Sequence, residues 1–266
     1  MKLYVFSFKK AITNILGIAA LIVLVMMNRT QSQTVFRTES IKKLPIYCVE
    51  TDKKVCALSF DAAWGAEDTD TLIEILDKYN AKATFFVVGE WVDKYPEEVK
   101  KLHKAGHDVM NHSNTHKYMT KIDNATLVNE VEKCSDKIEK LLGVRPTLFR
   151  APYGDYNSEV ISKLLSMGYH TIQWDVDSLD WKEVTVSDIY NKVISNVKNG
   201  SIILFHNAAK NTPEALPKIL EKLKNDGYSF VKISDMIYDD DYYIDNTGMQ
   251  ISNKSLTKDI KNEKAQ

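Results

Sequence analysis

The hydrophobic residues of the central chain follow two alternating patterns. Short apolar runs, typical of buried strands, are each followed by a longer segment in which apolar residues recur at helical spacing. Leu72, Ile73 and Leu76, for example, share one face of a predicted helix. Strands are predicted at residues 55–60, 83–88, 107–110, 147–150, 169–174, 201–205 and 229–231. Helices are predicted at residues 69–79, 96–105, 126–142, 158–167, 186–197 and 215–225.

Glycines mark the transitions from helix to strand. Each lies just past a helical segment, where a left-handed residue commonly ends a helix: Gly106, Gly143, Gly168, Gly200 and Gly227. About seven parallel strands alternating with helices predict an α/β fold, and we expect a distorted, incomplete (β/α) barrel. An open doubly wound sheet is the alternative. No glycine-rich phosphate loop follows the first predicted strand, so no nucleotide cofactor is expected.

An almost unbroken apolar run near the N-terminus predicts a membrane anchor. Residues 11–27 are close to the minimum length for a helix that spans a bilayer. Lys2, Lys9 and Lys10 precede the run, which predicts that the N-terminus stays inside and the rest is translocated. No small-x-small cleavage site follows the run, so an uncleaved anchor is favoured over the alternative of a cleaved signal peptide. We expect a single-pass membrane protein with an extracytoplasmic domain.

The composition agrees with a folded domain, since 44% of the residues are hydrophobic and 27% are charged. A net charge of −1 gives no overall basic field, so no nucleic-acid partner is expected. The predicted organisation is a cytoplasmic N-terminus (1–10), a transmembrane anchor (11–28), a stalk (29–50), a folded domain (51–238) and a flexible tail (239–266).

The cysteines leave two interpretations open. Cys48 and Cys56 are close enough in the sequence to pair, although the odd total of three would leave one thiol free. Cys56 falls in a predicted strand and Cys134 in a predicted helix, where reduced and packed thiols are the alternative.

Reactive side chains follow the predicted strands at their carboxyl ends, where ligands bind in parallel α/β proteins. Asp61 follows the first strand and His206 the sixth. The third, fourth and fifth strands are followed by His112 and His116, Arg150, and Asp177. This placement predicts a catalytic site at one rim of the sheet.

Each of these residues has a structural and a functional interpretation. His112 and His116, four apart on a predicted helical turn, could share one divalent metal ion, or they could be solvated surface residues. Asp61 could cap a helix, or it could act as a general base towards a water activated by the metal. His206 could be a satisfied core residue, or the acid that protonates a leaving group.

Arg150 and Asp177 also allow two interpretations. They could form a structural salt bridge with each other. If they flank the acid and the base instead, they would tune the pKa values of those two groups.

Five ordered segments resemble the motifs of the polysaccharide deacetylase family (NodB homology, carbohydrate esterase family 4). They are SFD at 59–61, HSNTH at 112–116, RAPYG at 150–154, DSLDW at 177–181 and IILFH at 202–206. The match covers about residues 55–238, and five motifs in order are far more specific than any one of them. The segment FDAAWG at 60–65 and the predicted anchor also resemble membrane-anchored sporulation-type members of Gram-positive bacteria.

The resemblance implies a role for each matched residue. Asp61 would be the catalytic base and His206 the acid, with Arg150 orienting the base and Asp177 tuning the acid. The backbone N–H of Tyr153 would help to hold the oxyanion. The metal ligands would be His112 and His116, and the substrate pocket would be lined by Pro152, Trp181 and Leu204.

The first motif departs from the family pattern. The family usually has a second aspartate there as a metal ligand, and this chain has Ala62. The divalent ion, with zinc expected and cobalt or nickel as alternatives, would then be held weakly. Glu67 and Asp68 are the nearby acids that could complete the site.

The implied activity is hydrolysis of the acetamide of N-acetylated amino sugars in a cell-wall polysaccharide, releasing acetate. The substrate would be a peptidoglycan-like or chitin-like polymer. A catalytically impaired relative that binds cell-wall glycan is one alternative, and Ala62 favours it. A metal-dependent amidase or esterase for small substrates is another.

Overall fold

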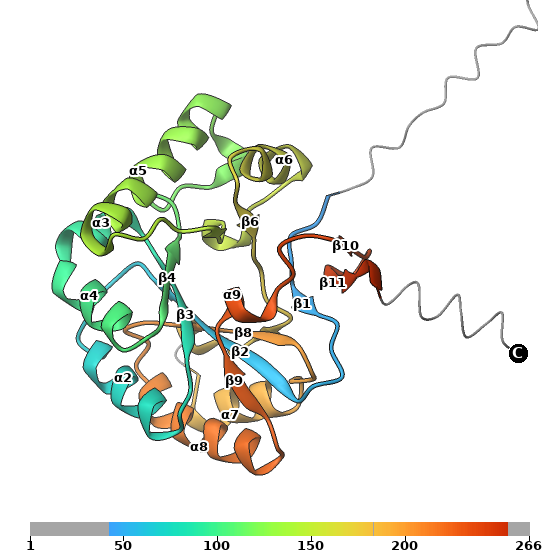
Figure 1. Ribbon diagram of the computed structural model, residues 1–266. Coiled ribbons are helices and arrows are strands. Elements are labelled where there is room, and N and C mark those ends of the chain that lie inside the picture. The colour runs from blue at the N-terminus through green and yellow to red at the C-terminus, as the bar shows by residue number, and fades with distance from the viewer. Residues whose placement is uncertain (1–42, 183, 255–266) are drawn as a thin grey trace, which may run out of the picture. The chain divides into compact units, whose positions relative to one another are not determined.

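The computed structural model describes residues 43–182 and 184–254, and its centre is a curled parallel sheet (Figure 1). Strands β8, β2, β3, β4, β5 and β6 lie side by side in that order, and each adjacent pair is parallel. Their bounds are β2 Val55–Ala62, β3 Ala83–Val87, β4 Asp108–Asn111, β5 Leu148–Phe149, β6 His170–Thr171 and β8 Ser201–His206. Two short strands, β7 (Val176–Asp177) and β9 (Ser229–Val231), add parallel pairs to β8 and β2.

The longer helices lie around the outside of the sheet (Figure 1). Their bounds are α2 Thr69–Lys78, α3 Gly89–Lys94, α4 Pro96–Lys104, α5 Asn124–Leu142, α6 Ser158–Ser166, α7 Val186–Ile194 and α8 Thr212–Asn225. The short helix α9 (Ile233–Met236) contacts β2 and β3, and the 3-10 turns are η1 Met119–Lys121, η2 Pro152–Gly154 and η3 Asp180–Lys182. Local sequence sets several boundaries. For example, Asp123 accepts the amide of Thr126 at the start of α5, and Gly143 ends that helix at φ 74°.

Every strand and helix predicted from the hydrophobic pattern has a counterpart, with some ends shifted by a few residues. The largest difference lies in the predicted strand at 169–174, of which only His170 and Thr171 form β6. Asp177 belongs to the separate strand β7. The six-residue helix α3 was not predicted because it is too short to show a helical period.

The predicted stalk includes a segment that belongs to the sheet. Strand β1 (Cys48–Val49) pairs antiparallel with β8, and Ile46 forms a parallel bridge with Ile172, next to β6. Residues 46–49 thus connect the two ends of the parallel run, as the expected distorted barrel requires. The boundary at residue 50 was wrong, because a segment this short carries no clear strand period.

The predicted tail also contains sheet. Strands β10 (Tyr242–Ile244) and β11 (Met249–Ser252) form a hairpin, and β11 pairs parallel with β1. The side chain of Gln250 is fully buried and bonds both backbone groups of Tyr238. The hydrophobic pattern did not predict this hairpin because its segment is acidic and polar. The side chain that anchors it, Gln250, is a buried polar residue, and the pattern identifies only buried apolar residues.

Strand alternation separates the two faces of β2. Cys56, Leu58, Phe60 and Ala62 pack in the apolar layer between the sheet and the helices, whereas Ala57 packs inside the barrel. Asp61 has the same parity as Ala57 and points to the interior. Asp61 and Ala62 therefore lie on opposite faces of the strand.

The cysteines are all free and buried, so the alternative of a Cys48–Cys56 disulfide is excluded. Burial raises the pKa of Cys48 to about 11 and that of Cys56 to about 12. The predicted anchor at 11–28 lies outside the described residues. Within residues 43–254, leaving out 183, no helix has the length and apolar character needed to cross a bilayer.

Candidate active site

The predicted reactive residues gather at the carboxyl ends of the parallel strands. They surround a cavity of about 500 Å³ lined by Asp61, Ala63, Trp64, His112, His116, Tyr153, Trp174, Asp177, Trp181, Leu204 and His206. Arg150 is fully buried and reaches the site through Asp61. Parallel strands bring these residues together because their carboxyl ends share one edge of the barrel.

Asp61 is held by the guanidinium of Arg150. Nη1 of Arg150 donates to Oδ1 of Asp61 at 2.8 Å, and Nη2 donates to the carbonyl of Gln173 at 3.1 Å. The guanidinium also lies over the Phe86 ring, 4.2 Å from its centroid, and 5.5 Å from that of Trp174. The alternative in which Arg150 pairs with Asp177 is wrong. Its contact is with Asp61, as the predicted role of Arg150 in orienting the base requires.

The surroundings of Asp61 keep its carboxylate ionised. Burial alone would raise its pKa, but the positive charges of His112, when protonated, and of Arg150 outweigh burial and lower the pKa. Oδ2 of Asp61 lies 3.5 Å from Nε2 of His112. The carboxylate oxygen that does not bond Arg150 therefore faces the histidines, as a base acting beside them requires.

The two histidines come together on a loop and not on the predicted helical turn. Ser113 and His116 have φ angles of 68° and 59°, in the left-handed region, and no helix spans residues 112–116. The imidazole centroids of His112 and His116 are 5.0 Å apart. The prediction that they face one site is correct, but the spacing of four reflects a tight loop.

Buried polar contacts fix this loop. The amide of Ser113 donates to Oδ1 of Asn111 at 2.7 Å, and Glu130 of α5 accepts both the amide and the hydroxyl of Thr115 at 2.7 Å. The Glu130 residue is only 2% exposed. These contacts stabilise the left-handed conformation that places His116 beside His112.

The donor atoms of the two imidazoles suit a divalent metal ion. Nδ1 of His112 donates to the carbonyl of Arg150 at 2.8 Å, which leaves the Nε2 lone pair of the neutral ring available. Burial lowers the pKa of His112, and burial with the nearby His112 charge lowers that of His116 to about 4. Nδ1 of His116 is buried without a hydrogen-bond partner. Neutral imidazoles with available lone pairs are the form that binds zinc.

Among the residues described, no third side chain joins the two histidines in a conventional metal site. In the part of the chain that the structure describes, no group of three or more His, Cys, Asp or Glu residues is placed to hold an ion. Ala62 packs in the outer apolar layer. Glu67 accepts the amide of Ala66 and Oδ2 of Asp68 accepts the amide of Ala208, and neither acid is grouped with the two histidines as a third ligand.

His206 is hydrogen-bonded to Asp180, whereas Asp177, which was predicted to tune the acid, raises the pKa of His206 through its charge without a hydrogen bond to it. Nδ1 of His206 donates to Oδ1 of Asp180 at 2.8 Å, while Oδ2 accepts the His206 amide at 2.9 Å and the Thr212 hydroxyl at 2.7 Å. Asp177 accepts the Leu179 amide and acts on His206 only through its charge. Both aspartates belong to the DSLDW segment, and the sequence alone gave no means of choosing between them.

Asp180 changes the acid–base character of His206. Burial would lower the pKa of His206, but the hydrogen bond and charge of Asp180, together with the charges of Asp61 and Asp177, outweigh burial and raise the pKa above its usual value. The ring nitrogen that does not bond Asp180 is Nε2. A protonated His206 can therefore present Nε2–H as a donor within the cavity.

The pocket lining differs in part from the prediction. Trp181 and Leu204 line the cavity, but Pro152 is buried and does not. Trp64 and Trp174 line it without having been predicted. Trp64 follows Asp61 by three residues and Trp174 is the last residue of a predicted strand, so position on the rim was the signal that could have found both.

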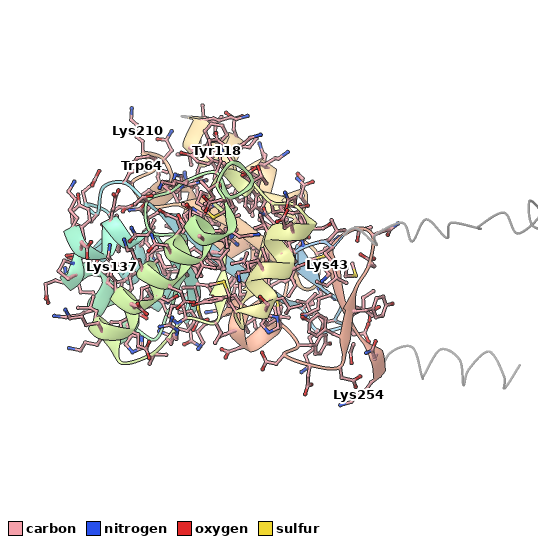
Figure 2. The ribbon with its side chains drawn as sticks, turned by 90° about the horizontal axis from the view of Figure 1, so that it is seen from above. Lys43, Trp64, Tyr118, Lys137, Lys210 and Lys254 are labelled. Carbon is pink, nitrogen blue, oxygen red and sulfur yellow. The ribbon has the colours of Figure 1, made fainter. Side chains whose placement is uncertain are left out.

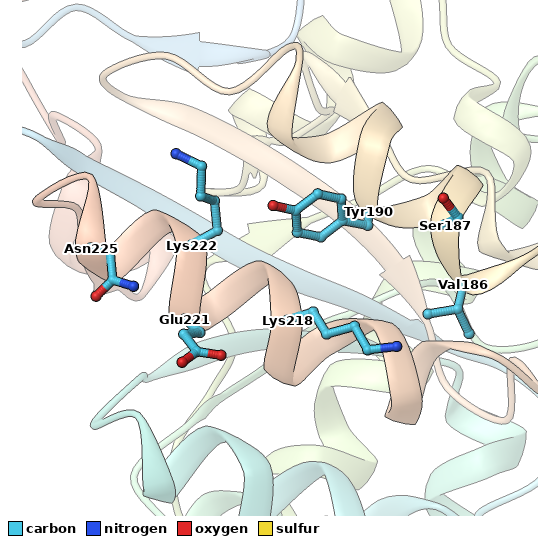
Figure 3. Close-up of a pocket in the computed structure, with 7 residues that line it drawn as sticks. All are labelled: Val186, Ser187, Tyr190, Lys218, Glu221, Lys222 and Asn225. Atoms are coloured by element: carbon cyan, nitrogen blue, oxygen red, sulfur yellow. The ribbon is translucent and has the colours of Figure 1, made fainter.

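A second depression lies between α7 and α8 (Figure 3). It encloses about 600 Å³ and is lined by Val186, Ser187, Tyr190, Lys218, Glu221, Lys222 and Asn225. It contains none of the predicted catalytic residues, so the candidate active site is the rim cavity.

Comparison with known proteins gives the family. The sequence profile of the family described as polysaccharide deacetylase matches residues 49–172. A peptidoglycan-N-acetylglucosamine deacetylase of Bacillus cereus is 35% identical over 71% of this chain and 91% of its own length. The peptidoglycan-N-acetylmuramic acid deacetylase PdaC of Bacillus subtilis is 36% identical over 71% of this chain. The chain belongs to the polysaccharide deacetylase family.

Solved structures of family members share the fold. One is a mutant of BA3943, described as a CE4 family pseudoenzyme with restored enzymatic activity, and the wild-type protein is from Bacillus anthracis. The structure of the mutant has a TM-score of 0.70 and is 33% identical to this chain, and the match covers 74% of this chain and 72% of the mutant chain. The chain spans 62% of the length of the Bacillus subtilis relative YlxY and 40% of that of PdaC.

Proposed function

We propose that this protein is a metal-dependent N-deacetylase that hydrolyses the acetamide of N-acetylated amino sugars in peptidoglycan and releases acetate. The observation that carries the proposal is the pairing at the cavity. Asp61 is bonded to Arg150, and His206 is bonded to Asp180. A protein that only binds glycan needs neither pair, whereas acetamide hydrolysis needs a base and an acid on one substrate. The deacetylase relatives support peptidoglycan as the substrate class.

The chemistry follows from the protonation states of the two pairs. Asp61, with its lowered pKa, is ready to accept a proton from the attacking water. His206, with its raised pKa, is ready to donate a proton to the departing amine. Trp181 and Leu204 supply an apolar wall for the acetyl methyl group, and the Tyr153 backbone N–H is the proposed oxyanion donor.

His112 and His116 would hold the divalent ion, for which zinc is the proposed identity. When bound, such an ion supplies a Lewis acid that lowers the pKa of water and polarises the acetamide carbonyl. Two neutral histidines without the usual aspartate make a weak site. The protein should therefore depend on added metal more strongly than a three-ligand relative.

A second candidate is a catalytically impaired relative that binds cell-wall glycan. Ala62 favours it, as does the similarity to BA3943, a pseudoenzyme of the same family. The two candidates differ in one measurable respect. The first releases acetate from polymer, and the second binds polymer without releasing acetate.

Acetate release is therefore the test. Purified peptidoglycan would be incubated with the protein in zinc and, separately, in chelator, with Asp61→Asn as the matched inactive control. The proposal expects zinc-dependent acetate that the control does not produce. Polymer binding without acetate in saturating zinc would establish the second candidate.

We also propose that the protein is a single-pass membrane protein with its domain outside the cytoplasmic membrane. The basic residues before the apolar run at 11–28 support this orientation. Protease added to intact protoplasts should digest the domain, and full protection would overturn the topology.

A further inference from the structure

Exposed aromatic side chains are concentrated at the mouth of the active-site cavity. Among the described residues, the exposed large hydrophobic side chains are Trp64, Tyr118, Val144, Tyr153, Leu165 and Trp181. Trp64, Tyr153 and Trp181 line the cavity, and Tyr118 stacks on Tyr153. Exposed aromatic rings that are gathered in one place on a folded domain, and not scattered singly, commonly mark a binding surface.

Three of these rings form a continuous row with His116. Tyr118 lies parallel to Tyr153, with centroids 4.1 Å apart and planes at 12°. The His116 ring meets Tyr153 edge-on at 4.5 Å and meets Trp64 edge-on at 5.7 Å. Trp64 and Tyr118 lie along the same border of the domain (Figure 2). The row therefore runs from the β2 end of the site to the loop before η1.

The backbone next to both ends of the row is anchored, although the outer rings are exposed. Met119, directly after Tyr118, is fully buried, and Asp155 accepts the amide and hydroxyl of Thr120 at 2.7 and 2.9 Å. At the other end, the carbonyl of Gly65 accepts bonds from Trp91 and Asn207. Exposed rings on anchored backbone lose little conformational entropy when they bind a ligand.

The chemistry of the row fits a sugar chain better than a protein or a membrane. Pyranose rings have apolar C–H faces and polar edges, and aromatic rings within a polar rim complement both. Trp64 is 65% exposed and Tyr118 49%, yet the row is a narrow line broken by the imidazole of His116 and not a broad apolar patch.

We propose that Tyr118, stacked on Tyr153, and Trp64, across His116, bind sugar units that flank the unit being deacetylated. The ligand is an oligosaccharide of N-acetylated amino sugars, and its chemical class rests on the proposed function. Tyr118 lies outside the five motif segments and is the specificity-determining residue of this surface. A chain long enough to cover the row binds more tightly than a monosaccharide.

Calorimetry of the full chain with N-acetylglucosamine and its β-linked oligomers, up to the pentasaccharide, tests the proposal. Affinity should rise with chain length. Tyr118→Ala and Trp64→Ala should each weaken pentasaccharide binding roughly 10-fold, a loss typical of a buried aromatic contact. Tyr118→Phe keeps the ring and should bind like the wild type. Val144→Ala and Leu165→Ala remove exposed apolar side chains that do not line this cavity, and they should have no effect.

The binding outcomes are separate from those of the acetate assay. Affinity that does not depend on length, or wild-type binding by a folded Tyr118→Ala variant, would overturn the binding surface even if acetate is released. Length-dependent binding that requires Tyr118, without acetate release, would support the surface and reject the deacetylase. Circular dichroism of each variant establishes that it is folded.

Discussion

Asp180 binds His206 through both of its carboxylate oxygens. Oδ1 accepts Nδ1–H at 2.8 Å, and Oδ2 accepts the backbone amide at 2.9 Å. A single aspartate on η3 thus fixes the ring orientation and tautomer of His206 and contributes most to raising its pKa. Thr212 at the start of α8 donates to the same Oδ2, which links the acid to the outer helix layer.

The pairing of Asp180 with His206 predicts where deacetylase activity falls on the alkaline side of its pH profile. The proposed acid must be protonated, and because its pKa is raised, activity should persist above pH 6.5 before it falls. Asp180→Asn removes the hydrogen-bonded charge that contributes most to the raised pKa of His206, so this fall in activity should move to lower pH. Asp177→Asn is the matched control and should move it less, since Asp177 acts only through its charge. An NMR titration of the His206 ring gives the same comparison without turnover, and equal shifts in the two variants would contradict the assignment.

The proposed base is tested by Asp61→Asn. The amide keeps the shape of the carboxylate but cannot take the proton from water, so kcat should fall ~10²–10⁴-fold, as for other general acid–base groups. Steady-state acetate release measures kcat, and thermal melting measures any loss of fold. Arg150→Lys keeps the charge but loses the planar group that bonds Asp61 and the Gln173 carbonyl at the same time. This variant should therefore also have lower activity. Near wild-type turnover in a folded Asp61→Asn variant would remove Asp61 from the mechanism.

The missing metal ligand is tested by Ala62→Asp. Ala62 is 1% exposed in the outer apolar layer, so the introduced carboxylate should lower the melting temperature in chelator. Zinc should recover this loss by drawing the carboxylate towards the histidines, because a ligand that binds the native state stabilises it. Zinc affinity should tighten on the order of 10-fold.

Ala62→Asn is the control for this substitution, since it has similar size and is a poorer ligand. Calorimetry with zinc and melting curves with and without zinc compare the two variants. An identical zinc response from both would show that residue 62 does not reach the ion.

His107 predicts a loss of stability in acid. It is 2% exposed, its Nδ1 accepts the Ala83 amide at 3.2 Å, and burial lowers its pKa to about 4. Between pH 6.5 and about 4 the unfolded chain therefore takes up a proton that the native protein does not, and stability falls as the pH drops through this window.

His107→Asn keeps the acceptor and removes this titration, so its melting temperature should decline less steeply over the same range. His103→Asn, on the exposed face of α4, is the control and should follow the wild type. Parallel melting curves for His107→Asn and the wild type would exclude His107 as the cause.

Much of the fold was readable from the sequence because it depends on local periodicity. The runs that became β2, β3 and β8 are continuous apolar segments, and the intervening helices show a 3.6-residue period. Residues 46–49 and the β10–β11 hairpin were missed. Short, partly polar strands depend on partners far away in the sequence, such as Ile172 for Ile46 and the backbone of Tyr238 for Gln250.

The sequence by itself determined which residues stand at the rim, because the end of each strand fixes the position of the next residue. Asp61, His112, His116 and His206 followed from that rule alone. Only the tertiary structure decided how these residues pair, that is, Arg150 with Asp61 and Asp180 with His206. Hydrogen bonds at 2.8 Å depend on side-chain direction and loop conformation, and residues three apart in one motif, such as Asp177 and Asp180, differ in both. The stacking of Tyr118 on Tyr153 was likewise set by long-range packing, since the 34 intervening residues carry no signal of the contact.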